Sequence, residues 1–540
     1  MKNIFTLLLL FLVIGKGFSQ EDAWIYLTDK PNVAASIANP ISILTQKAID
    51  RKQNHNVAID ERDVPVNETY ISDLKLQTGI TVMAKSKWFN AIHVRGIEAD
   101  INALSNLNYV DRIDFANKSL NAASRNTSNL NKWEVENSTI AFTYGDTQNQ
   151  VEMINADNLH IADFTGEGIT IAVMDAGFPS VNTMSGFQRL RDNGDLLNGY
   201  DFVDRVSDVY AFTGNNHGTK VLSTMAGFVQ NLYVGTAPDA SYYLFRTEDS
   251  ASENPVEESY WVEAAERADS LGVDMINTSL GYTDYDNSNY DYTPADMNGQ
   301  VTYIAKGASI AAEKGILVVV SAGNSGATAW QTVGSPADSP DVLSIGAVNA
   351  DGNYVSFSSQ GSSAQVGYQK PDVVARGGAT FVIDQFDAIV QNNGTSFSGP
   401  IMCGGIASLW QAIPNASPTE VMNLVRESAS QYTSPDNFLG YGIPDLDLAR
   451  TNALSVDAVE LETFTIYPNP SPSRLNIKMP STVNKVEVSI CNQIGQEVIQ
   501  QYITQDSNYI DVSELVSGVY MITVVTNHNS NTYKFIKSSN

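Results

Sequence analysis

Cysteine is scarce in this sequence, which has only Cys403 and Cys491 among its 540 residues. Two cysteines are too few for a disulfide framework, and no Cys/His cluster has the spacing of metal ligands. Because Cys403 lies in a small apolar stretch and Cys491 in a separate region, we expect both to be free thiols. The fold must then be stabilised by its hydrophobic core or by bound ions.

Basic residues are also in short supply, since 32 Lys and Arg against 60 Asp and Glu give a formal net charge of −28. A surface this acidic repels nucleic acid and anionic membranes, so we expect neither as a partner. Hydrophobic residues make up 43% and charged residues 17%, which excludes wholesale disorder and allows a large core. The length predicts two or three domains.

Long apolar runs are lacking except near the start of the chain. Ile4 to Ile14 is apolar, follows Lys2 and precedes the small-x-small sequence Gly17-Phe18-Ser19. This pattern predicts a secretory signal peptide, residues 1–19, cut before Gln20. The alternative is a membrane anchor, but the run is shorter than the roughly 20 apolar residues that a span requires. We expect a protein secreted through the periplasm, without an integral membrane segment.

The rest of the sequence changes pattern three times. Residues 20–118 mix strand-like and helical stretches, which is typical of a small α+β domain. Residues 119–149 are rich in Asn, Ser and Thr, which predicts an exposed linker. In residues 150–455 apolar strands alternate with helices, which indicates an α/β fold with a mainly parallel sheet flanked by helices. Residues 462–540 form short alternating strands between Gly, Asn and Ser turns, which predicts a small all-β sandwich.

Two polar residues lie at the ends of predicted elements in the α/β region. Asp175 follows the strand Ile169–Met174, and functional groups gather at such carboxyl ends. It is either a capping residue or an acid that orients another group. His217 immediately precedes an amphipathic helix; a lone histidine there is more often structural. Of the five histidines it is nevertheless the best placed to act as a general base in this region.

Two further residues have a structural and a catalytic interpretation. Ser396 precedes a small apolar stretch, which we predict to be a buried helix with Pro400 in its first turn. Ser396 is then either an N-cap or a nucleophile whose backbone N–H faces a developing oxyanion. Asn324 follows the predicted strand Ile316–Ser321 and is either a turn residue or the second donor to that oxyanion.

The chain order Asp175, His217, Ser396 is that of subtilisins and differs from the orders in chymotrypsin-type enzymes and α/β-hydrolases. The local sequences Asp175-Ala-Gly177, His217-Gly-Thr219 and Gly394-Thr-Ser396, with Pro400, also resemble the motifs of the subtilisin-like (subtilase) serine peptidases. Ser279-Leu280-Gly281 resembles their substrate-pairing strand. Ala322-Gly323-Asn324 resembles their oxyanion segment. Lys370-Pro-Asp372 is also similar to a sequence pattern of this family. The sequence departs from these family motifs at Ala176 and at Ser398-Gly399. At both places one small residue stands where the family motif has another small residue.

This resemblance implies a serine endopeptidase that hydrolyses proteins or peptides. Its triad would be Asp175, His217 and Ser396, with an oxyanion hole assisted by Asn324. Ser279, Leu280, Gly281 and Gly323 would bind the substrate, and no organic cofactor would be required. Residues 20–118 look like the family's propeptide, an intramolecular chaperone and inhibitor, so we expect a self-processing precursor.

A calcium site is conceivable, but the pattern of the best-known relatives is not recognisable, and we assign no metal ligands. Four aspartates crowd a Tyr-rich insertion after Gly281: Asp284, Asp286, Asp291 and Asp296. They form either a cation site or a solvated acidic loop beside the substrate groove.

The C-terminal region contains Ile466-Tyr-Pro-Asn-Pro470 and ends with Lys534-Phe-Ile-Lys537. It resembles the type A sorting domains of the type IX secretion pathway, which implies the secretion machinery as a partner. The alternative is an accessory sandwich that binds substrate or carbohydrate. For the whole protein the rival is a non-catalytic subtilase-fold binding protein, although no triad member is missing. A metal hydrolase is the weaker rival, because one well-placed histidine cannot build a zinc site.

Overall fold

A computed structural model describes residues 20–121, 142–454, 464–479, 485–493, 496–505, 507–525 and 530–539. The chain forms two compact units, Met1–Leu454 and Ser455–Asn540, which we describe separately. The predicted signal peptide and most of the predicted linker, residues 122–141, lie outside the described residues. Within the described ranges, every helix is too short or too polar to cross a bilayer.

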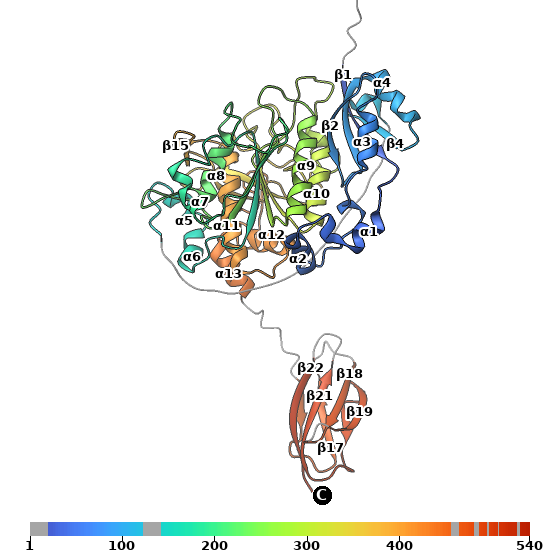
Figure 1. Cartoon of the computed structure of the whole chain (residues 1–540). Helices are drawn as coiled ribbons and strands as arrows, with labels where there is room; N and C mark the ends of the chain where they lie inside the picture. The colour runs from blue at the N-terminus through green and yellow to red at the C-terminus, as the bar shows by residue number, and fades with distance from the viewer. Residues whose placement is uncertain are drawn as a thin grey trace, which may run out of the picture. The chain divides into compact units, whose positions relative to one another are not determined.

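A seven-stranded sheet forms the centre of the first unit, with the order β13-β12-β11-β10-β5-β9-β6 (Figure 1). Every neighbouring pair in this order is parallel, as the sequence predicted. The strands are β5 Thr170–Asp175, β6 Tyr200–Asp201, β9 Ser241–Arg246, β10 Met275–Thr278, β11 Leu317–Ser321, β12 Leu343–Val348 and β13 Val373–Arg376. The strand order reverses beside β5, and ligands of open parallel sheets bind at such switch points.

Helices cover both faces of this sheet (Figure 1). α8 (His217–Ala226) and α11 (Thr395–Ala412) pack on one face, where Ile171 and Val173 of β5 join their core. α9 (Val256–Leu271) and α10 (Tyr303–Glu313) pack on the other face. This unit also contains α5 Gln148–Glu152, α6 Ala156–Ile161, α7 Gln188–Asp192, α12 Pro418–Glu427, α13 Leu446–Leu454 and the hairpin β14 Thr380–Ile383 and β15 Ile389–Asn392.

The placement of Pro400 corrects one prediction. α11 begins at Thr395, so Pro400 is the sixth residue of the helix and not part of its first turn. A proline there cannot donate to the carbonyl group of Ser396, four residues earlier. That carbonyl instead accepts a hydrogen bond from the hydroxyl of Ser279 at 3.1 Å. The proline therefore frees a helix carbonyl for a contact with the segment after β10.

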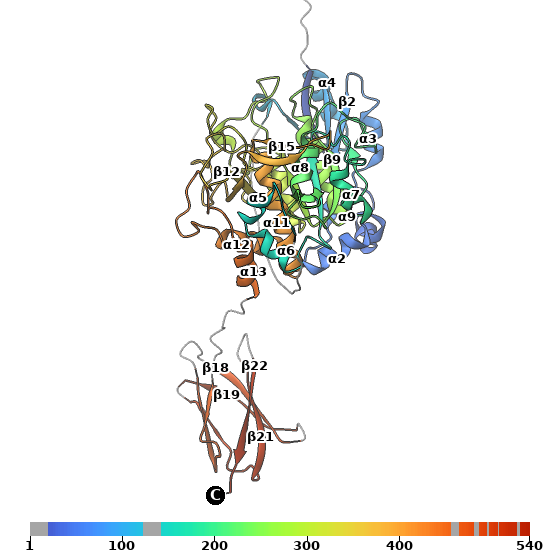
Figure 2. The same ribbon diagram turned by 90° about the vertical axis from the view of Figure 1, so that its left-hand side faces the viewer.

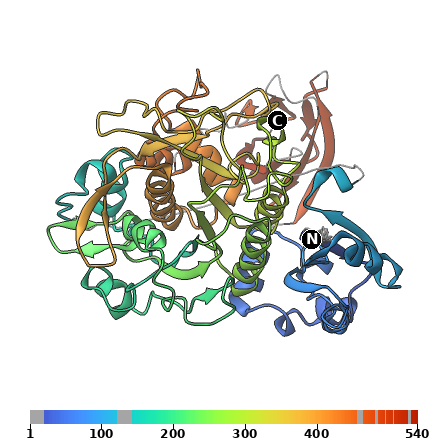
Figure 3. The same ribbon diagram turned by 90° about the horizontal axis from the view of Figure 1, so that it is seen from above.

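Residues 20–121 form a four-stranded antiparallel sheet with the order β2-β3-β1-β4. The strands are β1 Gln20–Leu27, β2 Thr81–Ser86, β3 Ala91–Ile97 and β4 Val110–Phe115, and the helices are α1 Val33–Ala38, α2 Gln46–Asn54, α3 Glu68–Leu74 and α4 Glu98–Ala103. This confirms the predicted α+β class, although α1 and α2 were not predicted. The region, blue in Figure 3, lies beside α9 and α10, and Trp24 stacks on Tyr303 of α10.

The second unit consists of two antiparallel sheets, with the orders β16-β17-β20 and β19-β18-β21-β22 (Figure 2). Its strands are β16 Thr465–Tyr467, β17 Arg474–Lys478, β18 Lys485–Cys491, β19 Glu497–Thr504, β20 Tyr509–Asp511, β21 Gly518–Val525 and β22 Ser530–Lys537. Side chains of both sheets, among them Ile477, Val488 and Phe535, share one core. The predicted all-β sandwich is confirmed. Cys491 lies here and Cys403 in α11, and both are free, as expected.

Candidate active site

Asp175 and His217 are in direct contact. Asp175 is the last residue of β5 and His217 the first of α8, so both lie at the carboxyl end of the sheet. Nδ1 of His217 lies 2.8 Å from Oδ1 of Asp175. The close approach requires Gly218, because a Cβ there would lie 2.6 Å from the carbonyl oxygen of Gly177 and 2.9 Å from the Cβ of Asp175. The two elements therefore fix the imidazole against the carboxylate.

The environment of this pair determines the protonation of the imidazole. The Asp175 side chain is fully buried, and its Oδ1 also accepts the N–H of Ala176 at 2.7 Å. The His217 side chain is 29% exposed. Burial lowers the pKa of His217, but the charge and hydrogen bond of Asp175 raise it by more, so this pKa lies above its ordinary value of 6.5. With Nδ1 bonded to the carboxylate, Nε2 is the nitrogen left to exchange a proton.

Ser396 is the second residue of α11, and Gly394 occupies the N-cap position, so the N-cap interpretation of Ser396 is wrong. Its hydroxyl donates to the carbonyl group of Ser279 at 3.3 Å, while the hydroxyl of Ser279 donates to the carbonyl of Ser396. In the described chain this hydroxyl is thus paired with Ser279 and not with His217. The neighbouring Phe397 ring lies 5.8 Å from the His217 ring, measured between centroids. The reciprocal serine contact ties the start of α11 to the predicted substrate-pairing segment.

Asn324 contacts Thr395, the residue before Ser396. Its Oδ1 accepts both the backbone N–H of Thr395 at 2.9 Å and the Thr395 hydroxyl at 3.1 Å. This double contact fixes the amide, so that Nδ2 is free to point elsewhere. A Cβ built on Gly394 would lie 3.6 Å from both this Nδ2 and the backbone nitrogen of Ser396. Both nitrogen atoms therefore lie near the position that a side chain at residue 394 would occupy.

The remaining predicted site residues lie around these groups. Gly323 has φ +106°, which favours glycine, and its N–H donates to the Thr395 hydroxyl at 3.1 Å. Ser279 is buried, Leu280 is half-buried and Gly281 is exposed. Asn277 donates to the Ser279 hydroxyl at 3.2 Å. The segment after β10 is thus anchored at Ser279 and becomes accessible towards Gly281.

Glu248, two residues after β9, was not predicted from the sequence. The N–H of Thr247 donates to the carbonyl of Asp175 at 3.1 Å, and the Glu248 carboxyl accepts the hydroxyl of Tyr282. Burial above all raises the pKa of Glu248 to about 8. The contact joins the loop beside Asp175 to the residue after Gly281. No motif marks this glutamate, and only its place after a strand could have pointed to it.

The aspartates of the Tyr-rich insertion form separate hydrogen bonds and do not gather around one point. Asp286 accepts the N–H of Glu253 at 3.1 Å, and Asp291 accepts that of Tyr285 at 2.8 Å. Asp296 bonds to Thr293 and to Lys118 of the N-terminal region. Across the described ranges, no group of three or more His, Cys, Asp or Glu side chains is placed to hold a metal ion.

Comparisons with known families match three parts of the chain. Residues 22–132 match the Bacteroidota propeptide domain of peptidase S8, residues 166–442 match the subtilase family, and residues 465–538 match a secretion system C-terminal sorting domain. These matches agree with the resemblances drawn from the sequence, and they favour the sorting domain over an accessory binding sandwich.

Individual relatives match the central part of the chain. Subtilisin E of Bacillus subtilis is 29% identical over 301 residues, which cover 55% of this chain and 70% of that protein. An alkaline protease of Alkalihalobacillus alcalophilus is 25% identical over 300 residues, covering 55% and 68%. Among solved structures, MycP1 from Mycobacterium smegmatis has a TM-score of 0.45 at 22% identity, covering 59% of this chain and 88% of that one.

Proposed function

This chain belongs to the subtilase family of serine endopeptidases, and we propose that Ser396 is its nucleophile, His217 its general base and Asp175 the acid that orients the imidazole. The observation that carries this assignment is the 2.8 Å contact between His217 Nδ1 and the buried Asp175, at the sheet end where α11 presents Ser396. The chain is made with a propeptide and a sorting domain, so it is exported to the cell surface or the medium.

The proposed reaction is acyl transfer to Ser396. Its hydroxyl turns from the Ser279 carbonyl to Nε2 of His217 and attacks the peptide carbonyl as His217 takes its proton. Such a bond is often absent without substrate and forms in the substrate complex. His217 then protonates the leaving amine, and water repeats the cycle to release the acid product. No organic cofactor takes part in these steps.

The substrate backbone is proposed to lie along Ser279, Leu280 and Gly281, and Gly323 borders the same groove. This is supported by the anchoring of Ser279 to Ser396 and by the exposure of Gly281. The N–H of Ser396 and Nδ2 of Asn324 are the proposed donors to the oxyanion. Preorganised donors of this kind stabilise the transition state because they need no reorganisation when the charge develops.

Replacing Asn324 by Ala is expected to raise the barrier of the chemical step by about 3 kcal/mol, the scale known for the equivalent donor in a subtilisin. The loss should appear in kcat and leave KM nearly unchanged, because the oxyanion forms only in the transition state. Steady-state kinetics on a chromogenic peptide measure it. Asn277→Ala, which removes a donor to Ser279 and none to the oxyanion, is the comparison variant. Equal losses of kcat in the two variants would argue against the assignment.

Self-processing tests the catalytic assignment in the full chain. The wild-type precursor is expected to be cut within residues 119–149 at a rate independent of protein concentration, because the cut is intramolecular. The Ser396→Ala precursor should stay full length. Gel electrophoresis and N-terminal sequencing of purified precursors follow the reaction. A Ser396→Ala precursor that matures normally in a peptidase-free preparation would refute self-processing. The isolated 20–118 fragment should inhibit the mature enzyme.

A further inference from the structure

The segment after β9 that contains Glu248 is anchored at both of its ends. The N–H of Thr247 donates to the carbonyl of Asp175 at 3.1 Å. Further along, the hydroxyl of Ser250 accepts a hydrogen bond from the side-chain amide of Asn215, at 3.1 Å, in the loop that leads into α8. Because both anchors belong to segments that carry residues of the proposed triad, Glu248 has a fixed position beside that triad.

Tyr282 holds the carboxyl group of Glu248. This tyrosine directly follows Gly281, is fully buried, and pairs with the backbone of Ser335 in both directions, at 2.9 and 3.3 Å. Its hydroxyl donates to Oε1 of Glu248. Oε2 accepts no hydrogen bond within the described ranges, and Glu248 is half-buried. One oxygen of a positioned carboxyl group is therefore left for a donor between the proposed triad and residues 279–281.

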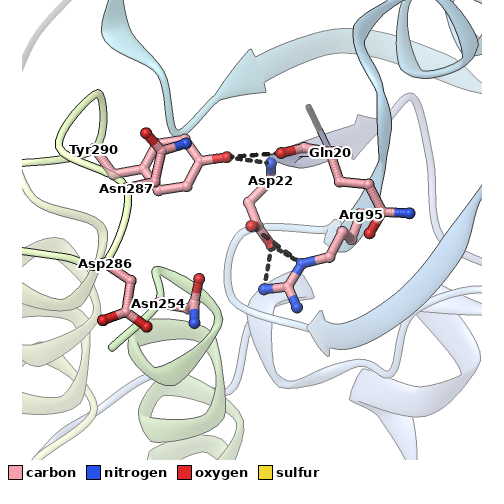
Figure 4. Close-up of a pocket in the computed structure, with 7 residues that line it drawn as sticks. All are labelled: Gln20, Asp22, Arg95, Asn254, Asp286, Asn287 and Tyr290. Atoms are coloured by element: carbon pink, nitrogen blue, oxygen red, sulfur yellow. Dashed lines mark hydrogen bonds and ion pairs between the residues drawn. The ribbon is translucent and has the colours of Figure 1, made fainter. Parts of the chain in front are cut away.

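The far end of the same loop has different surroundings. Asn254 lines a polar pocket together with Asp22 and Arg95 of the N-terminal region (Figure 4). Arg95 donates to Asp22 at 3.1 Å, so the cation of this pocket is already paired within the N-terminal region. The pocket is thus part of the contact with the N-terminal region, whereas Glu248 lies beside the proposed triad.

The proposed course of the substrate brings one of its side chains to Glu248. Successive side chains of an extended peptide point to opposite sides. When the peptide lies along residues 279–281 with its scissile carbonyl at Ser396, the side chain of the residue that carries this carbonyl points towards Gly323. The preceding side chain then points the other way, towards His217 and Glu248. This placement rests on the proposed function.

We propose that Glu248 gives the enzyme a preference for peptides with arginine or lysine directly before the residue whose carbonyl group is attacked. A guanidinium or ammonium group there pairs with the free carboxyl oxygen, and a charge-assisted hydrogen bond of this kind is stronger than one between neutral groups. The partial burial of Glu248 strengthens the attraction further, because water screens it less. An acidic side chain at the same position is repelled.

The protonation of Glu248 makes this preference depend on pH. Burial above all raises the pKa of Glu248 to about 8. The titratable groups that surround it are Glu253, Glu257, Asp175, His217 and Tyr282. The preference should therefore be weaker below pH 8 and stronger above it, where Glu248 is ionised and arginine is still charged.

The test uses processed enzyme, cut at a recognition site for an unrelated peptidase inserted between residues 121 and 142 and freed of the N-terminal fragment. Two chromogenic peptides are compared that differ only in arginine or citrulline before the residue at the cut, because citrulline has the shape of arginine without its charge. The ratio of their kcat/KM values should be about 10 at pH 9 and about 3 at pH 6.5. Titration of His217 cancels in this ratio, since it affects both peptides equally.

Glu248→Gln should bring this ratio to about 1 at both pH values, because the amide keeps the shape of the side chain but not its charge. The matched control is Asp249→Asn, which removes the same charge one residue further along, where the carboxyl oxygens accept the Ala251 N–H and the Ser252 hydroxyl at 3.2 Å each. The control should keep the wild-type ratio, which separates Glu248 from the general acidity of the protein. Equal ratios in Glu248→Gln and the wild type would overturn the proposal. So would a wild-type ratio near 1, a result that needs no variant to fold.

The Ser396→Ala enzyme keeps a failure of this proposal apart from a failure of the proposed triad. Its affinity for the same two peptides, measured by fluorescence anisotropy at pH 9, should favour arginine about 10-fold while neither peptide is cut. Cleavage by this variant would refute the nucleophile assignment, and the preference for arginine would still be measured. Equal affinities for the two peptides would overturn the assignment of Glu248 alone.

Discussion

Alanine at His217 is expected to lower kcat by about 10⁶-fold, and alanine at Ser396 by about as much, the scale measured in a subtilisin. The two losses should not add, because each removes the same proton-coupled attack. The double variant should therefore be as slow as either single one. Its remaining activity would come from the oxyanion donors and from binding, neither of which depends on these two side chains.

The measurement needs processed enzyme, so each precursor is cut in the linker by an unrelated peptidase and freed of the N-terminal fragment. Ser398→Ala is the matched control. Ser398 is buried two residues further along α11, where its hydroxyl donates to the carbonyl of Thr395 at 3.2 Å and makes no hydrogen bond with Ser279, Asn324 or His217 in the described residues. The control should keep kcat close to that of the wild type. Activity of Ser396→Ala near the level of this control would refute the nucleophile assignment.

The fold of the central domain could be predicted because the apolar pattern of its strands in the sequence agrees with their burial in the structure. Every residue of β5, β10, β11 and β12 is buried, which is why β5, β11 and β12 are mainly apolar in the sequence. The residues of the proposed triad lie at element ends, and parallel topology brings such ends to one edge of the sheet. Motif and topology therefore pointed to the same place.

Helix α2 of the N-terminal region could not be predicted in this way. Its sequence is QKAIDRKQN, and its buried side chains are Ala48, Arg51 and Lys52. Apolar periodicity detects helices that bury apolar faces, but two of these three side chains are charged. Their burial is compensated by Asp63 and Asp269, of which Asp269 lies more than 200 positions away in the sequence. A local pattern contains no information about such a partner.

The prediction that Pro400 lies in the first turn of its helix was wrong for a related reason. The rule that proline favours the first turn rests on the missing N–H costing nothing there. In α11 the cost is offset by the hydroxyl of Ser279, which bonds to the carbonyl left free. Glu248 was missed because its significance comes from Asp175 and Tyr282, which lie on other segments. In each of these positions the decisive partner is distant in sequence.

Asn in place of Asp175 is expected to lower kcat by about 10⁴-fold while the fold stays intact, since such a change in a related triad has this effect. Oδ1 of Asp175 accepts two N–H groups, from Ala176 and from His217 Nδ1. An amide at this buried position can also present its NH₂ group to the imidazole, which then carries its proton on Nε2, the nitrogen that must act as the base.

The pH profile distinguishes this role from a purely structural one. The pKa of His217 lies above 6.5, because the charge and hydrogen bond of Asp175 outweigh the lowering by burial. In Asp175→Asn the two largest raising contributions are lost, while burial and the charge of Lys220 still lower the pKa of His217, so this pKa should fall below 6.5. The active form has a neutral His217, and activity is lost as the pH falls through this pKa. The acid limb of kcat/KM should therefore move to lower pH in the variant. An unchanged acid limb would mean that Asp175 does not set the protonation of His217, even if kcat fell as expected.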